Sequence, residues 1–194
     1  MASVTEATAS TIDIEKAIEE EPDGLYEFVG GKFVEKPLLG AYELALANIL
    51  GQGMNTYAKE NRLGQVFIEM IFRLKASPRL DRRPDIAFVS NQTWSPDRRL
   101  PRTAAWEIVP DLAIEVISPT NYSAADARKI EEYFQAGTKA VWMIYPDLSM
   151  VYVYTSPRSI AVFRHGDILE ASPILPGFRL VLSDFFDDRD SASV

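Results

Sequence analysis

Short apolar runs separated by polar turns recur along the chain and predict a protein with many strands. Two of these runs, 25–29 and 32–36, flank Gly30-Gly31. Two-residue hairpin turns need positive φ at both central positions, which glycine adopts without steric cost. The pattern therefore predicts a β-hairpin at this point.

Further apolar runs of strand length follow the hairpin. The first, 65–75, is long enough to contain a bend or a break. The others are bounded by residues typical of turns. These predicted strands are 83–90, 111–118, 140–145, 149–155, 159–164 and 178–182. The last three are expected to be antiparallel, with turns at Pro146-Asp147 and at His165-Gly166-Asp167.

Three other segments have apolar residues at helical spacing. They are 11–19, which ends before Pro22, then 41–61, which ends near Gly64, and 121–137, with Ser123 as N-cap and Gly137 as the C-terminal stop. The third helix joins the predicted strands 111–118 and 140–145, and such a strand-helix-strand unit allows two parallel strands. The whole pattern predicts a mixed α/β fold.

Length and composition indicate one domain. With 194 residues, 47% of them hydrophobic, the chain can bury a core that folds alone. Residues 1–12 are rich in Ser, Thr and Ala without periodicity, which predicts a flexible N-terminal arm. The domain is expected to span 13–187, followed by a flexible tail at 188–194.

The residue composition excludes several classes of site. Cysteine is absent, so disulfides, thiolate metal sites and a cysteine nucleophile are excluded. His165 is the only histidine, which also excludes a multi-histidine zinc site. No apolar run approaches the ~20 residues that span a bilayer, and the first residues lack the features of a signal peptide. We therefore expect a cytoplasmic protein with no membrane partner.

The charge distribution does not by itself predict nucleic-acid binding. The formal net charge is −8, whereas sequence-independent phosphate binding relies on clustered Lys and Arg. Acidic residues concentrate at 15–23 and 184–190, and six arginines lie between them at 79–83 and 97–102. These arginines could contact phosphate, or they could form a solvated loop with salt bridges, and the sequence leaves both alternatives open.

The strongest candidates for chemistry are Asp85, Glu115 and Lys129. Asp85 lies in the run Pro-Asp-Ile-Ala-Phe-Val, and Glu115 lies in Asp-Leu-Ala-Ile-Glu-Val-Ile-Ser. An unpaired carboxylate is costly in such apolar surroundings, so each acid indicates a buried partner or a function. Two carboxylates and an ammonium group could form a metal-assisted site that cleaves phosphodiesters.

A series of motifs extends from about Leu25 to Phe186, almost the whole chain. The motifs are Tyr26-Glu-Phe-Val-Gly-Gly, Pro84-Asp-Ile-Ala-Phe-Val-Ser90, Pro110-Asp-Leu-Ala-Ile-Glu-Val-Ile-Ser-Pro119, Lys129-Ile-Glu-Glu-Tyr-Phe-Gln-Ala-Gly137, Val141-Trp-Met-Ile-Tyr-Pro-Asp147 and Leu175-Pro-Gly-Phe. In this order they resemble the Uma-two family of restriction endonucleases, within the PD-(D/E)XK nuclease superfamily. The resemblance implies a restriction-endonuclease-like mixed β-sheet flanked by helices, with an N-terminal hairpin and C-terminal antiparallel strands. It also implies a divalent metal site and hydrolytic cleavage of DNA.

The chemistry of a metal site assigns roles to these residues. Mg²⁺, or Mn²⁺ in its place, is commonly bound by one or two carboxylates, with water and phosphate oxygens as the other ligands. Asp85 and Glu115 on neighbouring strands would meet this need. The Glu-x-Lys pattern of the superfamily is absent, because Ile117 stands two residues after Glu115. The resemblance suggests that Lys129 is a migrated catalytic lysine, which would orient the attacking water and offset negative charge from the helix.

Each candidate also has a purely structural explanation. Asp85 follows a proline and could be a turn or capping residue, and Lys129 alone could be a solvated helix charge. Glu115 is harder to explain without a cation, because its neighbours are apolar on both sides. Glu27, Glu43 and Glu69 compete, in that order, to supply a further acid, although surface charge could explain each one. Glu27 is preferred because it lies in the family-like hairpin.

Two functions of different classes remain in competition. The first is a metal-dependent endonuclease, for which a homodimer would be suitable because cutting both strands of a duplex commonly needs two active sites. The second is a catalytically inactive nuclease-fold module for binding or assembly, since fold does not imply function. Ile117 and the acidic net charge keep the second alternative open.

Overall fold

The computed structural model describes residues 22–75, 77–118 and 124–187. Four predictions lie outside these residues, namely the arm 1–12, the helix 11–19, the Ser123 cap and the tail 188–194. Within the described ranges, no helix is long and apolar enough to cross a membrane.

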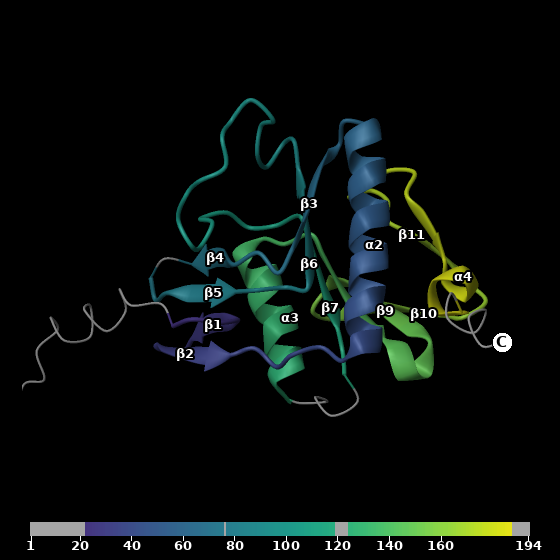
Figure 1. Ribbon diagram of the computed structural model, residues 1–194, viewed down its shortest axis with the longest axis horizontal. Helices are drawn as coiled ribbons and strands as arrows, with labels where there is room; N and C mark the ends of the chain where they lie inside the picture. The colour runs from purple at the N-terminus through teal and green to yellow at the C-terminus, as the bar shows by residue number, and fades with distance from the viewer. Residues whose placement is uncertain (1–21, 76, 119–123, 188–194) are drawn as a thin grey trace, which may run out of the picture.

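Strands outnumber helices, as the sequence pattern predicts (Figure 1). The strands are β1 (Tyr26–Val29), β2 (Lys32–Glu35), β3 (Gly64–Ile68), β4 (Phe72–Lys75), β5 (Leu80–Arg82), β6 (Ile86–Ser90), β7 (Leu112–Val116), β8 (Ala140–Tyr145), β9 (Met150–Ser156), β10 (Ser159–Arg164), β11 (Ile168–Glu170) and β12 (Arg179–Val181). The helices are α2 (Ala41–Glu60), α3 (Ala124–Ala136), the short 3-10 helix η2 (Pro146–Leu148) and α4 (Leu182–Asp187).

The largest sheet has six strands in the order β10-β9-β8-β7-β6-β3. Strands β7 and β8 are parallel and are connected through α3, which confirms the predicted strand-helix-strand unit. The other neighbouring pairs are antiparallel. The fold is therefore the predicted mixed sheet flanked by helices.

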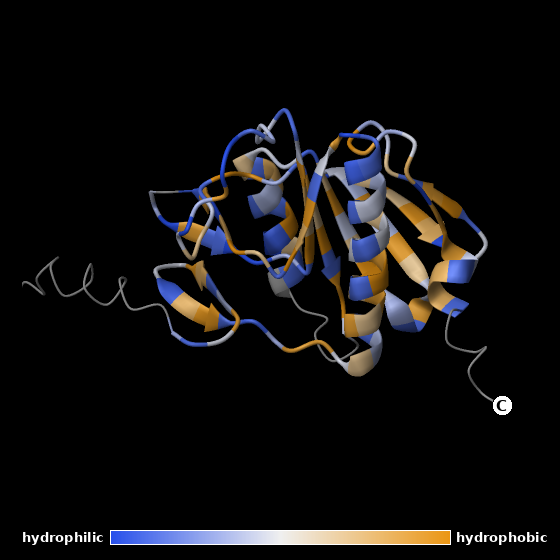
Figure 2. Ribbon diagram, turned by 45° about the horizontal axis from the view of Figure 1, so that its top comes forward, coloured by the Kyte–Doolittle hydropathy of each residue, from blue (hydrophilic) through white to orange (hydrophobic). Residues whose placement is uncertain are grey.

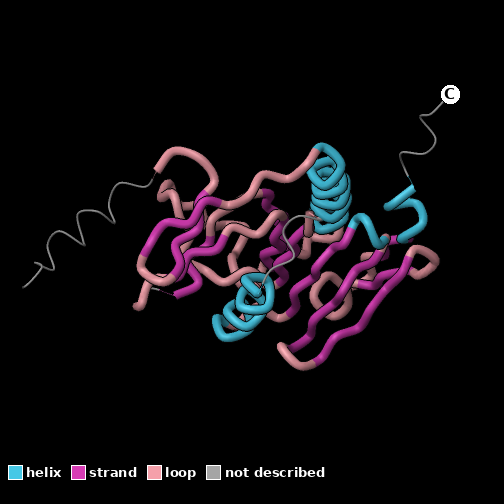
Figure 3. Tube along the Cα trace, turned by 90° about the horizontal axis from the view of Figure 1, so that it is seen from below, coloured by secondary structure: helices cyan, strands magenta, loops and turns pink. Residues whose placement is uncertain are grey.

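The two long helices cover opposite faces of this sheet, as the end-on view in Figure 3 shows. Successive side chains of a strand point to opposite faces, so alternation along β6 and β7 reports which residue faces which helix. Ile114 and Val116 belong to the core beneath α2, together with Leu50 and Met54 of that helix. The opposite face packs against α3 through alternate positions, which include Ala87, Val89, Ala113, Val141 and Met143. Figure 2 shows how strongly hydrophobic residues concentrate in these strands.

A second sheet of four strands, β2-β1-β5-β4, lies beside α3 (Figure 1). It begins with the predicted hairpin of β1 and β2, whose turn has φ values of 59° at Gly30 and 81° at Gly31. The predicted requirement for two positive φ angles is thus confirmed. Phe72 and Leu74 of β4 pack into the same core as α3, so the hairpin sheet is held against the α3 face of the large sheet.

The structure corrects several predicted boundaries. The run 65–75 divides at Glu69, which has a φ of 53°, and its halves β3 and β4 belong to different sheets. Residues 83–85 precede β6 instead of forming part of it. The predicted turn at His165 is present, but it does not close a hairpin, because β11 pairs with β12 and not with β10. Helix α4 was not predicted, since its six residues are too few to show a period.

The segment between β6 and β7 is anchored to the body of the protein by its tryptophans. Trp106 is 3% exposed and stacks on Phe72, with 5.8 Å between ring centroids. Trp94 contacts Trp106 edge-to-face, with 5.0 Å between the ring centroids. The Arg98 guanidinium stacks over the Trp94 ring, 3.7 Å from its centroid. The aromatic residues thereby fix this long segment to the body of the protein.

Candidate active site

Asp85 and Glu115 lie side by side at one end of the large sheet. The antiparallel register pairs Ile86 with Ile114, so the next pair in that direction is Asp85 with Glu115. Both carboxylates are on the α3 face, and their residues are only 2% and 3% exposed. The backbone N–H of Val116 donates to Oδ2 of Asp85 at 2.6 Å, which fixes the orientation of this carboxylate.

Helix α3 supplies two partners for Glu115. The Tyr133 hydroxyl donates to Oε1 of Glu115 at 2.9 Å, and the Lys129 ammonium lies 3.4 Å from the same oxygen. Residues four apart on a helix share one face, so Lys129 and Tyr133 reach the carboxylate together. Lys129 is also 3.3 Å from Oε1 of Glu27. The structure thus brings Asp85, Glu115, Lys129 and Glu27 into one cluster.

Glu27 is held by the hairpin sheet. Arg82, on the neighbouring β5, contacts Oε2 of Glu27 at 2.5 Å and also pairs with Glu132 of α3. The backbone N–H of Arg83 donates to Oε1 of Glu27 at 3.1 Å. Arg82 is 6% exposed. Of the two alternatives for the arginines, phosphate contact or salt bridges, Arg82 therefore follows the second. However, this arginine is buried and does not lie in a solvated loop.

Lys36 is a residue of the cluster that the sequence analysis did not identify. Its ammonium lies 2.6 Å from Oδ1 of Asp85 and 3.0 Å from Oε2 of Glu69, and the side chain is 5% exposed. The sequence contains no clear signal for this role, because a lysine at the exit of a hairpin is usually solvated. Only the packing of the hairpin sheet against the large sheet directs Lys36 inward.

The cluster opens into a pocket of about 320 Å³. The charged residues that line it are Glu27, Glu35, Lys36, Arg82, Asp85, Glu115, Asp126 and Lys129. Of the two other competing acids, Glu69 approaches the cluster through Lys36. Glu43 does not line this pocket, because its carboxylate lies over Gly40 at the start of α2.

Burial and neighbouring charges shift the pKa values of the three acids in different directions. Burial raises the pKa of Asp85, and this effect outweighs the nearby Lys36. Burial also raises the pKa of Glu115, and the neighbouring Asp85 charge adds to it while Lys129 opposes it. Burial opposes ionisation of Glu27, but Lys129, Arg82 and the Arg83 N–H together lower its pKa.

Both lysines are held in the charged form. Burial acts to lower the pKa of Lys36, but Asp85, Glu115 and Glu69 raise it overall. The same balance holds at Lys129, where Glu115 and Glu27 outweigh burial and raise the pKa above its usual range. Burial and the Glu115 charge raise the pKa of Tyr133, so its hydroxyl remains a donor at neutral pH. The cluster therefore combines two lysines whose pKa values are raised with two acidic groups, Asp85 and Glu115, whose pKa values are also raised.

These shifts predict how stability depends on pH in the metal-free protein. A carboxyl whose pKa is raised in the folded state contributes stability below its ordinary pKa, and loses it as pH rises through the folded value. We expect the free energy of unfolding of Glu115→Gln, relative to wild type, to increase as pH rises above the ordinary Glu115 pKa of 4.5. Urea unfolding from pH 5 to 8 with a chelator measures this difference. Glu131→Gln, an exposed change on the same helix, should show no such trend, and equal trends for both variants would contradict the expectation.

The donor set of the pocket fits a divalent cation. Asp85, directly before β6, and Glu115 on the neighbouring β7 supply hard oxygen ligands and face a pocket with room for water and phosphate oxygens, as Mg²⁺ prefers. Oε1 of Glu115 is engaged by Tyr133, whereas Oε2 accepts no hydrogen bond from a described residue. Among the described residues, no three acidic or histidine side chains form a ready-made cage. The residues fit a cation held by two carboxylates, with its remaining ligands from solvent or substrate.

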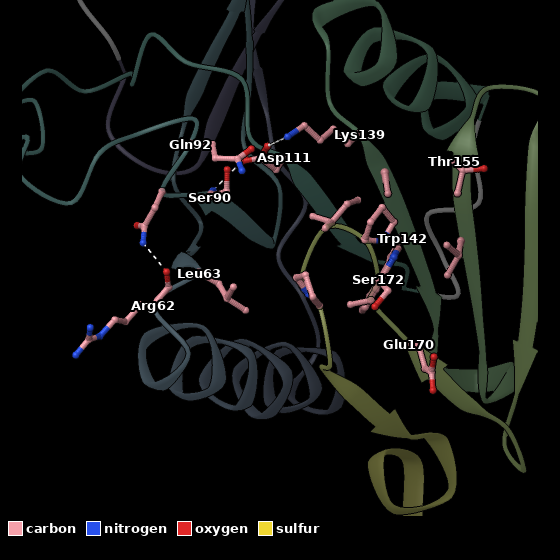
Figure 4. Close-up of a pocket in the computed structure, with 17 residues that line it drawn as sticks. Arg62, Leu63, Ser90, Gln92, Asp111, Lys139, Trp142, Thr155, Glu170 and Ser172 are labelled. Carbon is pink, nitrogen blue, oxygen red and sulfur yellow. Dashed lines mark hydrogen bonds and ion pairs between the residues drawn. The ribbon is translucent and has the colours of Figure 1, made fainter.

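A larger cavity of about 700 Å³ lies at the opposite end of β7 (Figure 4). Its wall includes Trp142, and its two acidic residues are both ion-paired, Asp111 with Lys139 at 2.6 Å and Glu170 with Arg179 at 3.3 Å. Asp111 also accepts the Ser90 N–H, so it serves the junction of β6 and β7. Size alone would favour this cavity, but the carboxylates and lysines suited to catalysis converge on the smaller pocket.

A mixed sheet with two buried carboxylates at the neighbouring ends of β6 and β7, beside a lysine from the flanking helix, defines an α/β protein of restriction-endonuclease-like fold. The model of the Uma2 family, described as "Putative restriction endonuclease", matches residues 13–183. The chain belongs to this family.

A solved structure from Anabaena variabilis ATCC 29413, described as "a putative nuclease belonging to DUF820", is similar in fold. The TM-score is 0.77 at 21% sequence identity, and the similarity covers 90% of this chain and 97% of the other. This similarity confirms the predicted fold class. A search of curated proteins found no match.

Proposed function

We propose that this protein is a metal-dependent endonuclease that hydrolyses phosphodiester bonds in DNA. The observation that carries the proposal is that Asp85 and Glu115, two buried carboxylates, line one pocket together with Lys129. Such acids are costly to bury without a function or a partner. Membership of the Uma2 family supports the same reading.

Each residue of the cluster has a distinct proposed role. Asp85 and Glu115 would hold Mg²⁺ or Mn²⁺, which supplies an activated water and offsets phosphate charge when it is bound. Lys129 would orient the attacking water and stabilise negative charge that develops on the phosphate. Glu27, ion-paired with Lys129 and Arg82, would position the lysine.

A catalytically inactive binding or assembly module is the second candidate. One contact favours it: the Lys36 ammonium already occupies Oδ1 of Asp85 at 2.6 Å. Ile117 also stands where the superfamily pattern has a lysine, and the net charge is −8. If this second candidate is correct, the cluster is a structural ion-pair network and the protein acts through its surface.

Plasmid cleavage separates the two candidates. Purified protein is incubated with supercoiled DNA and either Mg²⁺, Mn²⁺ or a chelator, and nicked and linear products are measured over time. The endonuclease hypothesis expects products only with the metal. Absence of cleavage and of metal binding by the folded protein would favour the inactive module.

The role of Lys129 is tested by Lys129→Met, which removes the charge and keeps the length of the side chain. We expect the cleavage rate at saturating metal to fall by about 10²-fold or more, as for loss of a positioned acid-base group. Metal affinity should not decrease, because the lysine is not a ligand. Lys59→Met, an exposed change in α2, is the control. Turnover by Lys129→Met equal to wild type would leave this lysine with a structural role only.

A further inference from the structure

Lys36 occupies a position in the cluster where carboxylates stabilise a cation. Its ammonium lies between two carboxylates from different elements, 2.6 Å from Asp85 and 3.0 Å from Glu69. Its charge also interacts with Glu115. The Lys36 side chain is 5% exposed, so water contributes little to stabilising the charge of its ammonium group. This is the environment that a divalent cation would need at Asp85.

Backbone contacts position both residues that surround the Lys36 ammonium. Glu69 lies at the break between β3 and β4 in the left-handed region, with a φ of 53°, which is unfavourable for a non-glycine residue. Its N–H donates to the Asp85 carbonyl at 3.2 Å, and its carbonyl accepts from the Arg83 guanidinium at 2.8 Å. Asp85 is held in turn by the Val116 N–H. The Asp85 carboxylate and the Glu69 backbone are therefore held by contacts that do not involve Lys36.

We propose that Lys36 is a tethered cation that occupies the metal position at Asp85 and must be displaced when a divalent ion binds. This inference rests on the proposed metal site at Asp85 and Glu115. Lys36 neutralises the carboxylates while the metal is absent, and this stabilises the empty site. The ion pair must break before Oδ1 of Asp85 can become a ligand, and the displacement lowers the affinity for the metal.

The inference predicts that removing Lys36 strengthens metal binding. Lys36→Met should bind Mn²⁺ about tenfold more tightly than wild type, since a charge-assisted contact no longer has to be broken. Calorimetric titration with MnCl₂ in the absence of DNA gives the affinity without any reading of activity. Lys32→Met removes the same charge from an exposed position on the same hairpin, and its affinity should stay close to that of wild type.

Thermal melting provides a second readout. Without metal, Lys36→Met should melt below wild type because Asp85 and Glu69 lose their counterion. At the same MnCl₂ concentration, its melting temperature should rise more than that of wild type. Lys36→Gln, which can still donate hydrogen bonds to both carboxylates, replaces Lys36→Met in both measurements if circular dichroism shows that the methionine variant does not fold.

The outcomes separate this inference from the proposed function. Equal or weaker Mn²⁺ binding by the neutral variants, with measurable binding by wild type, overturns the tethered cation and leaves the metal site intact. If Lys32→Met strengthens binding as much as Lys36→Met, general electrostatics explains the effect and the tethered cation is wrong. If neither the folded wild type nor a neutral Lys36 variant binds Mn²⁺, both the inference and the proposed metal site are rejected.

Discussion

Replacing Glu115 with glutamine is expected to lower metal-dependent DNA cleavage by at least about 10³-fold, and Asp85→Asn should have a similar effect. Each substitution keeps the shape of the side chain but removes a charged ligand, and a bound metal contributes several kcal/mol of charge stabilisation. Glu115 is the stronger test, because Oε2 accepts no hydrogen bond from the described residues. The measurement is the rate of plasmid nicking at saturating Mn²⁺.

A double variant with both Asp85→Asn and Glu115→Gln shows whether the two acids hold one ion together or act separately. If both acids hold one ion, the double variant should be little worse than either single variant, because residues that act as a unit are strongly non-additive. Asp111→Asn is unsuitable as a control because this residue holds β6 and β7 together. Glu131→Gln, exposed on α3, is suitable. Cleavage at the wild-type rate by folded Glu115→Gln would contradict the assignment.

Replacing Arg82 with methionine is expected to lower the free energy of unfolding by about 3 to 5 kcal/mol. Arg82 is 6% exposed and pairs with Glu27 and Glu132, so its removal leaves buried acid without a counterion. A loss of about 3 kcal/mol corresponds to a fall in melting temperature of roughly 6–12 °C for a chain of this size. Urea unfolding and thermal melting in the presence of a chelator measure the two quantities.

An exposed ion pair of the same protein serves as the control. Arg179 pairs with Glu170 at 3.3 Å, but both side chains are about 60% exposed. Arg179→Met should therefore change stability by no more than about 0.5 kcal/mol. If Arg82→Met were as stable as Arg179→Met, Arg82 would not be the structural link between the hairpin sheet and α3.

The sequence predicts those parts of the fold that depend on local periodicity. Helix α2 and strand β8 lie close to their predicted bounds, since both are strongly patterned and end at glycine, proline or charged residues. The division of 65–75 between two sheets could not be located from the pattern alone. Its cause is the left-handed backbone at Glu69, which is held by contacts to Asp85 and Arg83. Those contacts involve residues distant in sequence.

The residues of the candidate site also differ in whether the sequence alone could identify them. Asp85 and Glu115 are recognisable because acids within apolar strand-like runs are rare, and Lys129 and Glu27 follow from the family resemblance. The structure brings all four together. Lys36 could not be predicted, because its role depends on how the hairpin sheet packs on α3 and β6 and not on its neighbours in sequence. Arg82 was one of several arginines with no local feature to mark it as buried.

A crystal soaked in MnCl₂ tests the central claim most directly. The metal is located by its anomalous signal, without reference to any activity. We predict a peak about 2 Å from carboxylate oxygens of Asp85 and Glu115, with the Lys36 ammonium withdrawn from Asp85. A saturated crystal with no peak at these carboxylates, and with Lys36 still on Asp85, would contradict the proposed metal site.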